Sequence, residues 1–412
     1  MSPEIKNILT INGGSSSIKF ALYEAGGEPA NEGSGSVTRE DGGSLVKRLS
    51  GKVDRIGLND TKLTFTNTLS KEEGSIPVNA KGLEQAADLL IDWLQQQKEA
   101  ASFSAVGHRV VHGMQHREAM MIDGKLLEEL HGISCYDPDH LPGEIELIEL
   151  FRRRTPGLLQ VACFDTAFHA SLPRVARLLP IPRRFDEAGI QRYGFHGLSY
   201  SYIMEELAGI AGPAIAAGPV IIAHLGNGAS LAAVKNGRSV DTTMGFTPAG
   251  GIVMGTRPGD LDPGVAWYIL QKEQLTAAQF NDLVNHQSGL LGISETSSDM
   301  QDLLGREDGD IRAAEAVALF CYQVKKCIGA YSAVLGGLDT LVFTGGIGEK
   351  APLIRSRICA GLEWLGIGLD RQRNENNDLL ISAPGHRVGV YTIPTDEEWM
   401  IAKTVYSLLK SQ

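Results

Sequence analysis

The sequence predicts an α/β fold made of two related domains. Segments with strand patterns alternate with segments in which apolar residues recur at helical spacing, as is typical of α/β proteins. A strand, a turn of small residues and a second strand occur in this order at residues 7–24 and again at 219–243. With 412 residues the chain can bury two domain cores, so the two similar units indicate an internal duplication.

The first half of the chain contains the elements expected of one such domain. "NILTIN" and "IKFALYE" predict two strands joined by the turn "GGSSS". Apolar residues at helical spacing in 82–98 predict an amphipathic helix, and "SAVGHRVVHG" and "LLQVACFDTAFH" predict strands that run into loops. Arg152–Arg154 are expected at a solvated helix end, and the domain boundary is expected near 150–165, where Arg-Thr-Pro-Gly interrupts the apolar pattern.

The second half repeats the pattern. Residues 219–243 predict strand, turn and strand, and "TLVFTGGIGE" in 340–349 predicts a strand that runs directly into a glycine loop. The stretch 207–223 predicts a helix end, a loop of small residues and a buried strand at Val220–His224. Its glycines and prolines, and a length short of the roughly 20 residues of a membrane-spanning helix, argue against a membrane span. Residues 398–412 leave room only for a closing helix.

Composition excludes several classes of function. A formal net charge of -11 would repel a phosphate backbone, so no nucleic acid partner is expected. No export signal is recognisable at the N-terminus, so we expect a cytoplasmic protein without a membrane partner. The five cysteines form neither a CxxC pair nor a metal-ligand cluster and are expected to be reduced, structural thiols: Cys135, Cys163, Cys321, Cys327 and Cys359.

Three loops of small residues follow strands, at 12–17, 226–230 and 344–348. Glycine lets backbone N–H groups approach an anion, and the serines and Lys19 add donors and a charge to the first loop. One such loop is more often a plain turn, but three at strand ends favour phosphate binding. The chain has neither the G-x-x-x-x-G-K-[ST] motif of P-loop enzymes nor the G-x-G-x-x-G motif of dinucleotide sites.

Ten motifs occur in the order of one known family: "INGGSSSIKF", "GHRVVHG", "FDTAFHASLP", "RYGFHGLSY", "HLGNGAS", "SVDTTMGFTP", "MGTRPGDLDP", "GISETSSDM", "FTGGIGE" and "IPTDEEWMIA". On these motifs the chain resembles the acetate kinase (acetokinase) family, of the superfamily that includes sugar kinases, actin and heat-shock chaperone ATPases. The resemblance implies phosphoryl transfer between ATP/ADP and a short-chain carboxylate or its acyl phosphate, with Mg2+ or Mn2+, in a homodimer.

The resemblance also implies a duplicated ribonuclease H-like fold with an active-site cleft between two domains. The first would comprise residues 1–160, completed by a C-terminal helix at 396–412. The second, residues 161–395, would carry the nucleotide-binding and dimerisation elements.

The chemistry of such a reaction agrees with the residues present. A carboxylate with a pKa of about 4 to 5 is already ionised and needs no general base, so the protein must bring two anions together. Arginine forks suit this task, and the resemblance gives Arg109, Arg257 and His196 the stabilisation of the transferring phosphoryl group. From the sequence alone, each arginine could equally form a surface ion pair and the histidine a structural contact.

The resemblance assigns the remaining site residues as follows. Asp165 matches a catalytic, magnesium-side carboxylate, although it could also be the base for a sugar hydroxyl or a helix cap. Asn12 and Glu397 match metal-site residues, and Val111, Phe195 and Pro248, with Arg109, match the acyl pocket. The nucleotide and its phosphates are assigned to Ser15, Ser17, Lys19, His224, Asn227, Gly228, Asp299, Gly345, Gly346, Ile347 and Gly348.

The chain departs from the family pattern in one loop. Where the family has a catalytic histidine, "ISCYDPDHLP" places Tyr136, and His140 could replace it only if the loop register shifts. Cys135 stands at a leucine position of the acyl pocket, and Gln301 stands where the family often has arginine near the nucleotide. We therefore expect an active kinase with an altered pocket.

The sequence favours acetate kinase activity, reversible and by direct in-line transfer, and leaves alternatives. A propionate or other short-chain acyl kinase is not distinguished, because one methylene in an apolar pocket is worth only about 1 to 3 kcal/mol. A sugar or polyol kinase would need Asp165 as a base and a polar pocket. An ATP-driven switch like actin or a chaperone would need a polymer surface or a client-binding domain.

Overall fold

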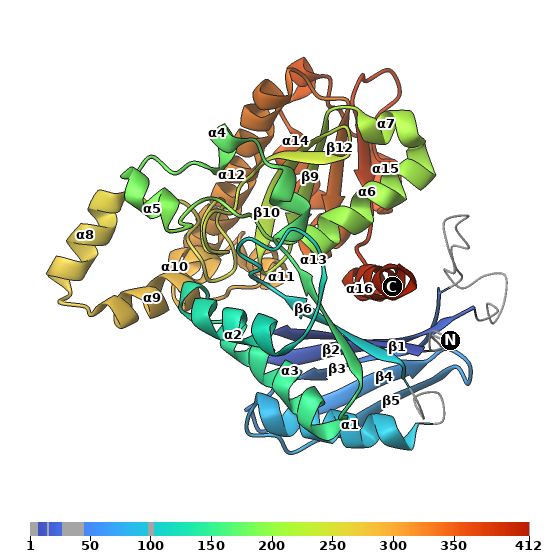
Figure 1. Cartoon of the computed structure of the whole chain (residues 1–412). Coiled ribbons are helices and arrows are strands. Elements are labelled where there is room, and N and C mark those ends of the chain that lie inside the picture. Colours follow the sequence, from blue (N-terminus) through green and yellow to red (C-terminus); the bar gives the residue numbers. More distant parts are fainter. Residues whose placement is uncertain (1–6, 15, 27–44, 98–102, 412) are drawn as a thin grey trace. The chain divides into compact units, whose positions relative to one another are not determined.

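The computed structural model describes residues 7–14, 16–26, 45–97 and 103–411, and Ser15 lies outside the described residues (Figure 1). The chain divides into two compact units. Unit 1 comprises Met1–Ala167 and Asp396–Gln412, and unit 2 comprises Phe168–Thr395.

Unit 1 is built on a mixed eight-stranded sheet with the order β5-β4-β3-β2-β1-β6-β8-β7. Strands β1 to β5 form an antiparallel meander, whereas β6 and β8 run parallel to β1. The strands are β1 Asn7–Gly14, β2 Ser17–Ala25, β3 Leu45–Asp54, β4 Lys62–Asn67, β5 Glu72–Pro77, β6 Ala105–Val110, β7 Met120–Met121 and β8 Leu159–Phe164.

Helices cover both faces of this sheet. They are α1 Leu83–Gln96, α2 Gly124–Ile133, α3 Leu141–Arg154 and α16 Glu397–Lys410, with a 3-10 turn η2 at Ser134–Tyr136. Leu9 and Ile11 of β1 point into a core with α1 and α3. On the opposite face α16 lies so close to β6 that a Cβ at Gly107 would come within 2.4 Å of Ile401 Cγ2.

Unit 2 is built on a mixed five-stranded sheet with the order β11-β10-β9-β12-β13. Its strands are β9 Val220–Leu225, β10 Ala229–Lys235, β11 Arg238–Thr242, β12 Thr340–Thr344 and β13 Gly389–Thr392. Along this order the neighbours pair antiparallel, antiparallel, parallel and parallel, as do β3-β2-β1-β6-β8 in unit 1. The predicted α/β fold with two mixed sheets is therefore confirmed, and the matching pairing supports its origin by duplication.

The helices of unit 2 flank its sheet and extend from it. Helix α6 packs on one face of the sheet, in a core with β9, β10 and β12. Helix α12 also contacts β10 and β9. Helices α8 and α9 form a hairpin that projects away from this sheet (Figure 1). The helices are α4 Arg174–Arg177, α5 Arg183–Glu187, α6 Gly197–Ala211, α7 Pro213–Ala217, α8 Pro263–Lys272, α9 Ala277–His286, α10 Gly289–Ser294, α11 Met300–Arg306, α12 Ile311–Leu335, α13 Gly345–Lys350, α14 Pro352–Cys359 and α15 Arg371–Glu375; 3-10 turns are η3 Ala167–Ser171 and η4 Glu363–Leu365.

Two local expectations are wrong. Residues 344–348 are not a loop, because helix α13 begins at Gly345 directly after β12. The small residues after α6 are not all loop either, because Pro213–Ala217 form α7, which begins with a proline at a position where no N–H partner is needed. Among the described helices, none combines the length and apolar character required to cross a bilayer.

Candidate active site

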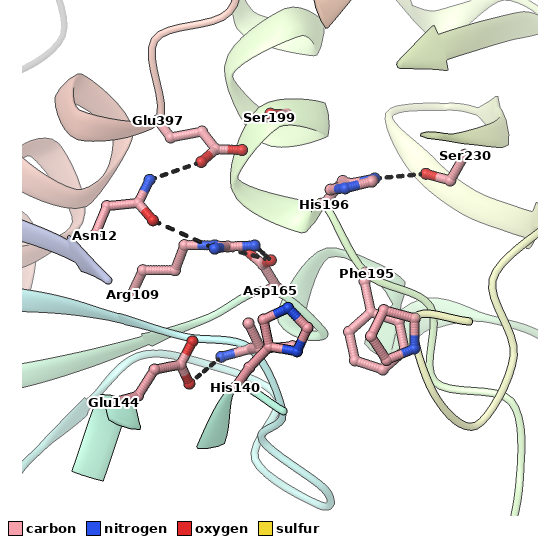
Figure 2. Close-up of polar contacts among 12 residues, drawn as sticks. Asn12, Arg109, His140, Glu144, Asp165, Phe195, His196, Ser199, Ser230 and Glu397 are labelled. Atoms are coloured by element: carbon pink, nitrogen blue, oxygen red, sulfur yellow. Dashed lines mark hydrogen bonds and ion pairs between the residues drawn. The ribbon is translucent and has the colours of Figure 1, made fainter. Parts of the chain in front are cut away.

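Strand alternation gathers three polar side chains on one face of the sheet of unit 1. Side chains alternate between faces, so Asn12 at the end of β1 points away from the core that contains Ile11. Arg109 shares the face of Gly107, against which α16 packs, and Asp165 directly follows β8. Figure 2 shows Arg109 between Asn12 and Asp165, with Glu397 from the first turn of α16 bonded to Asn12.

Arg109 and Asp165 form a buried ion pair. Arg109 donates to Asp165 Oδ2 from Nε at 3.0 Å and from Nη2 at 2.6 Å, and its Nη1 donates to Asn12 Oδ1 at 3.3 Å. The Asp165 side chain has no exposed surface, and Arg109 retains 16%. Burial raises the pKa of Asp165, while Arg109 and its N–H groups oppose the shift; the neighbouring carboxylates raise the pKa of Arg109, which stays charged. Asp165 accepts two hydrogen bonds from Arg109 and none from a helix N-terminus, so the alternative role as a helix cap is not observed.

Two carboxylate groups lie beside Asn12. Its Nδ2 donates to Glu397 Oε2 at 3.0 Å and to Glu398 Oε1 at 3.4 Å. Lys19 lies directly opposite Asn12 across the β1–β2 ladder and therefore on the same face. Carboxylate and amide oxygens are the ligands that Mg2+ prefers, and it needs only one or two carboxylates, so this donor set fits the metal.

The first small-residue turn is a tight hairpin. Gly14 pairs with Ser17 at the end of the β1–β2 ladder, so the two strands are joined by a short connection. A Cβ at Gly13 would come within 2.6 Å of Leu147 Cδ1 in α3, so this glycine allows close helix packing. Gly13 thus has a structural reason to be glycine that the sequence did not reveal.

The start of α3 adds acidic and histidine side chains that the sequence analysis did not single out as a group. Asp137 is buried and its Oδ1 bonds His140 Nδ1 at 2.9 Å. Glu144 is also buried, and its Oε2 accepts the Val111 N–H at 2.9 Å (Figure 2). Burial raises the pKa of Glu144 to about 8, and the negative charges of Asp137 and Asp165 add to the effect while Arg109 opposes it. The D-x-x-H spacing, which places two side chains on one side of a helical turn, could have indicated the pair.

The other residues of the divergent loop lie as follows. Tyr136 ends η2 and is half-buried, and Cys135 beside it is exposed. Val111 is buried directly after β6, two residues beyond Arg109.

In unit 2, His196 is held by a chain of hydrogen-bonded side chains. It occupies the N-cap position of α6 with a left-handed backbone, φ 59°, and its Nδ1 bonds Ser230 Oγ at 2.8 Å (Figure 2). Ser230 Oγ also forms a hydrogen bond with Tyr200 Oη at 2.5 Å. The rings of His196 and His224 stack with their centroids 4.3 Å apart. Burial raises the pKa of Tyr200, so the phenol stays protonated.

The turn between β9 and β10 brings His196 and Arg257 together. A Cβ at Gly228 would lie 3.4 Å from His196 Nε2 and 3.7 Å from Arg257 Nη2. Arg257 Nη1 donates to the Pro248 carbonyl at 2.8 Å. Asn227 accepts the Gly255 N–H through its carbonyl at 2.9 Å, which joins this turn to the "MGTRPG" segment. The side chains of His196 and Arg257 therefore both border Gly228, which has no side chain of its own.

The residues of unit 2 that are predicted to line the acyl pocket are held by other contacts. Phe195 is buried, and its carbonyl accepts a hydrogen bond from His169 Nε2 at 3.0 Å. The other ring nitrogen of His169 bonds Ser239 Oγ at 2.8 Å. Burial lowers the pKa of His169 to about 4, so the ring is neutral at pH 7 and supports Phe195.

The predicted nucleotide residues occupy two helix starts. Gly345 opens α13 with φ +77°, and a Cβ there would meet the Leu225 carbonyl at 2.7 Å. Its N–H donates to Glu349 Oε1 at 3.0 Å. Gly346, Ile347 and Gly348 continue this short helix. Asp299 is the N-cap of α11, where its Oδ1 accepts the N–H groups of Gln301 and Asp302.

Comparison with known proteins identifies the family. Residues 7–403 match the acetokinase family. The chain belongs to this family. It is 44% identical over 410 residues to the acetate kinase of Rhodopseudomonas palustris strain TIE-1, covering 97% of this chain and 98% of that protein. It is 41% identical over 414 residues to the acetate kinase of Caldanaerobacter subterraneus subsp. tengcongensis, covering 98% and 99%. The resemblance inferred from the ten motifs is therefore confirmed.

Solved structures of acetokinase-family proteins agree with the fold. The Porphyromonas gingivalis acetate kinase is 33% identical with a TM-score of 0.83, covering 98% of this chain and 100% of that one. A propionate kinase from Francisella tularensis subsp. tularensis SCHU S4 is 35% identical with a TM-score of 0.86, covering 97% and 98%. The chain thus shares its whole length with kinases that bear either substrate name.

Proposed function

We propose that this acetokinase-family chain is an acetate kinase, which transfers the γ-phosphoryl group of ATP to acetate and also runs in reverse. The observation that carries the proposal is the full-length match to acetate kinases at more than 40% identity. Arg109, within its network with Asp165 and Asn12, and Arg257 supply the cationic groups that such a reaction needs, and His196 beside Arg257 adds a hydrogen-bond donor. The standing alternative of a sugar kinase receives less support, because Arg109 already occupies one oxygen of Asp165, the candidate base.

The reaction needs no proton transfer in this direction. A carboxylate oxygen of acetate forms a bond to the γ-phosphorus, the bond from that phosphorus to the β–γ bridging oxygen breaks, and ADP leaves with the electron pair. Acetate is ionised at pH 7, so the protein acts by positioning two anions and by stabilising negative charge on the transferring group.

Each unit contributes cationic groups to this task in the proposal. Arg109 of unit 1 retains Nη1, bonded only weakly to Asn12 at 3.3 Å, for a substrate oxygen. In unit 2, donation from Tyr200 to Ser230 and from Ser230 to His196 Nδ1 leaves the proton of His196 on Nε2, beside Arg257 at Gly228. That residues of both units act in one cleft remains a prediction.

Magnesium is the metal that the donor set supports. Asn12, Glu397 and the nearby Glu398 would hold it, directly or through its waters. A bound Mg2+ supplies positive charge that offsets the charge of the nucleotide phosphates. Lys19, opposite Asn12, and Ser17 at the hairpin are assigned to phosphate contact, and Ser15 to the same loop.

The nucleotide is assigned to unit 2. Asn227 and Gly228 of the β9–β10 turn are proposed to contact its phosphates with His224, and Gly345–Gly348 and Asp299 are proposed to border the adenosine. Gly346 supports this assignment, since it is exposed and a Cβ there would meet no atom within 4 Å, which leaves room for a ligand beside the backbone.

The homodimer expected for the family has a candidate surface. No residue of α8 or α9 is buried within the chain, and α8 exposes Val265, Trp267 and Tyr268, with Trp267 66% exposed. Large apolar groups exposed together on a projecting hairpin favour a protein interface. We expect Trp267→Asp to convert a dimer to a monomer in light scattering; a wild-type monomer, or a variant that stays dimeric, would contradict this surface.

Trapping of the acyl phosphate tests the proposed function. Purified protein is incubated with Mg-ATP, hydroxylamine and, separately, acetate, propionate, butyrate or glycerol. Acetohydroxamate as the fastest product supports acetate kinase, whereas faster propionohydroxamate would make propionate the substrate, as in the Francisella relative. ADP release with glycerol alone, and no hydroxamate, would replace the proposal with a polyol kinase.

A further inference from the structure

His140 at the start of α3 is oriented by a buried carboxylate. Its Nδ1 bonds Asp137 Oδ1 at 2.9 Å, and the Asp137 side chain retains only 4% of its surface. A buried carboxylate usually accepts hydrogen bonds, because burial of its charge costs free energy unless a donor compensates. Since Asp137 accepts the Nδ1–H, the ring of His140 is fixed in one orientation.

The other nitrogen of this ring is available. Within the described part of the chain, Nε2 of His140 has no hydrogen-bond partner, and it is not among the buried unpaired atoms. The His140 side chain is 22% exposed, so Nε2 remains accessible to a ligand.

Its surroundings are those of the proposed substrate site. His140 is close enough to Asp165 to lower the pKa of that carboxyl group, and Asp165 is the partner of Arg109. The His140 carbonyl accepts the Glu144 N–H at 3.1 Å, and Glu144 in turn accepts the N–H of Val111. Figure 2 shows the ring of His140 and the carboxyl group of Glu144 below the Arg109–Asp165 pair.

A purely structural role explains these contacts less well. His140 occupies the N-cap position of α3, but its side chain makes no capping bond to the helix. An asparagine there would cap the helix better than histidine. Helix stability therefore gives no reason for a histidine whose second nitrogen is unused.

We propose that His140 is a substrate-binding residue and Asp137 its positioning residue: the ring, held at Nδ1 by Asp137, donates from Nε2 to an oxygen of the acyl phosphate. This inference rests on the proposed function and adds to it a donor from unit 1 besides Arg109. With Nδ1–H bonded to Asp137, donation from Nε2 needs a second N–H on the ring, and the donated bond leaves that proton on His140 throughout.

Two substitutions separate this role from a structural one. Asparagine places its amide N–H where histidine has Nδ1 and can keep the bond to Asp137, whereas glutamine reaches the position of Nε2 and can replace the donor to substrate. We expect His140→Asn to lower kcat/KM for acetyl phosphate about 10- to 100-fold in the ATP-forming direction, the effect of losing one bond from a charged donor. His140→Gln should recover most of this loss, and the KM for ADP should change less than about twofold in both variants.

The control is a second histidine–carboxylate pair, which joins α2 to α3. His131 of α2 bonds Glu149 of α3 at the same 2.9 Å, but His131 is 55% exposed. His131→Asn should leave kcat/KM unchanged. Added imidazole should partly restore His140→Ala, which a structural role would not predict.

The outcomes are distinct. Wild-type protein that makes no ATP from acetyl phosphate would refute the proposed function and this inference with it. Active wild type with His140→Asn at full activity would refute the inference alone. Equal losses in the Asn and Gln variants, without imidazole rescue, would also refute it and make His140 structural.

Discussion

Arg109→Ala should lower both the free energy of unfolding and the catalytic activity. Further variants can separate these two effects. Among the residues that the structure describes, Arg109 is the only cation bonded to Asp165, whose side chain has no exposed surface and whose Oδ1 already lacks a partner. Breaking a buried ion pair from one side typically costs about 3–5 kcal/mol, because the remaining charge stays buried. The free energy of unfolding should fall by this amount, and part of the loss should be avoided at lower pH, where Asp165 can take up a proton.

An exposed pair of the same length provides the control. Arg153 donates to Glu84 at 2.6 Å, as Arg109 Nη2 does to Asp165, but the two side chains are 59% and 50% exposed. Solvent screening limits such a pair to about 0–1 kcal/mol. Arg153→Ala should therefore change urea denaturation by less than 1 kcal/mol and leave the turnover number unchanged.

The double variant Arg109→Ala/Asp165→Asn separates folding from chemistry. It leaves no buried charge, so most of the lost stability should return, while kcat in the hydroxamate assay stays about 100- to 1,000-fold below wild type, as for removal of a transition-state donor. Recovery of activity together with stability would show that Arg109 acts only by neutralising Asp165. An unfolding free energy of Arg109→Ala within about 0.5 kcal/mol of wild type would refute the argument from burial.

Two further substitutions test the burial of Glu144 and the close packing of Gly345. Glu144→Gln should flatten the pH dependence of stability. The pKa of Glu144 in the folded protein is about 8, above its ordinary value of 4.5. The protonated Glu144 therefore contributes its full share to the free energy of unfolding below pH 4.5. This share is lost as the pH rises toward and through 8, by up to about 1.4 kcal/mol per pH unit. Urea denaturation between pH 5 and 8.5, with the exposed Glu146→Gln of the same helix as control, measures this, and parallel curves for wild type and Glu144→Gln would contradict it. Gly345→Ala should destabilise unit 2 by more than about 1 kcal/mol, because φ is +77° and the new Cβ would meet the Leu225 carbonyl at 2.7 Å. Gly346→Ala, whose Cβ would meet nothing within 4 Å, should not, and equal denaturation midpoints for the two would refute the steric argument.

Local patterns in the sequence were sufficient for much of the fold. The strands around the first turn form β1 and β2, the helix expected at 82–98 is α1, and Arg152–Arg154 end α3. These predictions succeed because strand and helix periodicity reflect which face of an element is buried. The helix at Gly345 escaped prediction because glycine has low helix propensity, so a helix there depends on tertiary contacts such as those with β9, β12 and α14.

The sequence by itself determined the family and the types of side chain in the candidate site, because ten motifs in a fixed order identify the chemistry without any coordinates. Only the tertiary structure decided how these side chains are paired. Asn12 meets Glu397 from 385 positions along the chain, and Arg109 meets Asp165 across two parallel strands. Burial of Asp137 and Glu144 likewise follows from how α3 packs. Sequence separation carries no information about such contacts, since solvent exclusion and pairing of charges arise only when distant segments fold together.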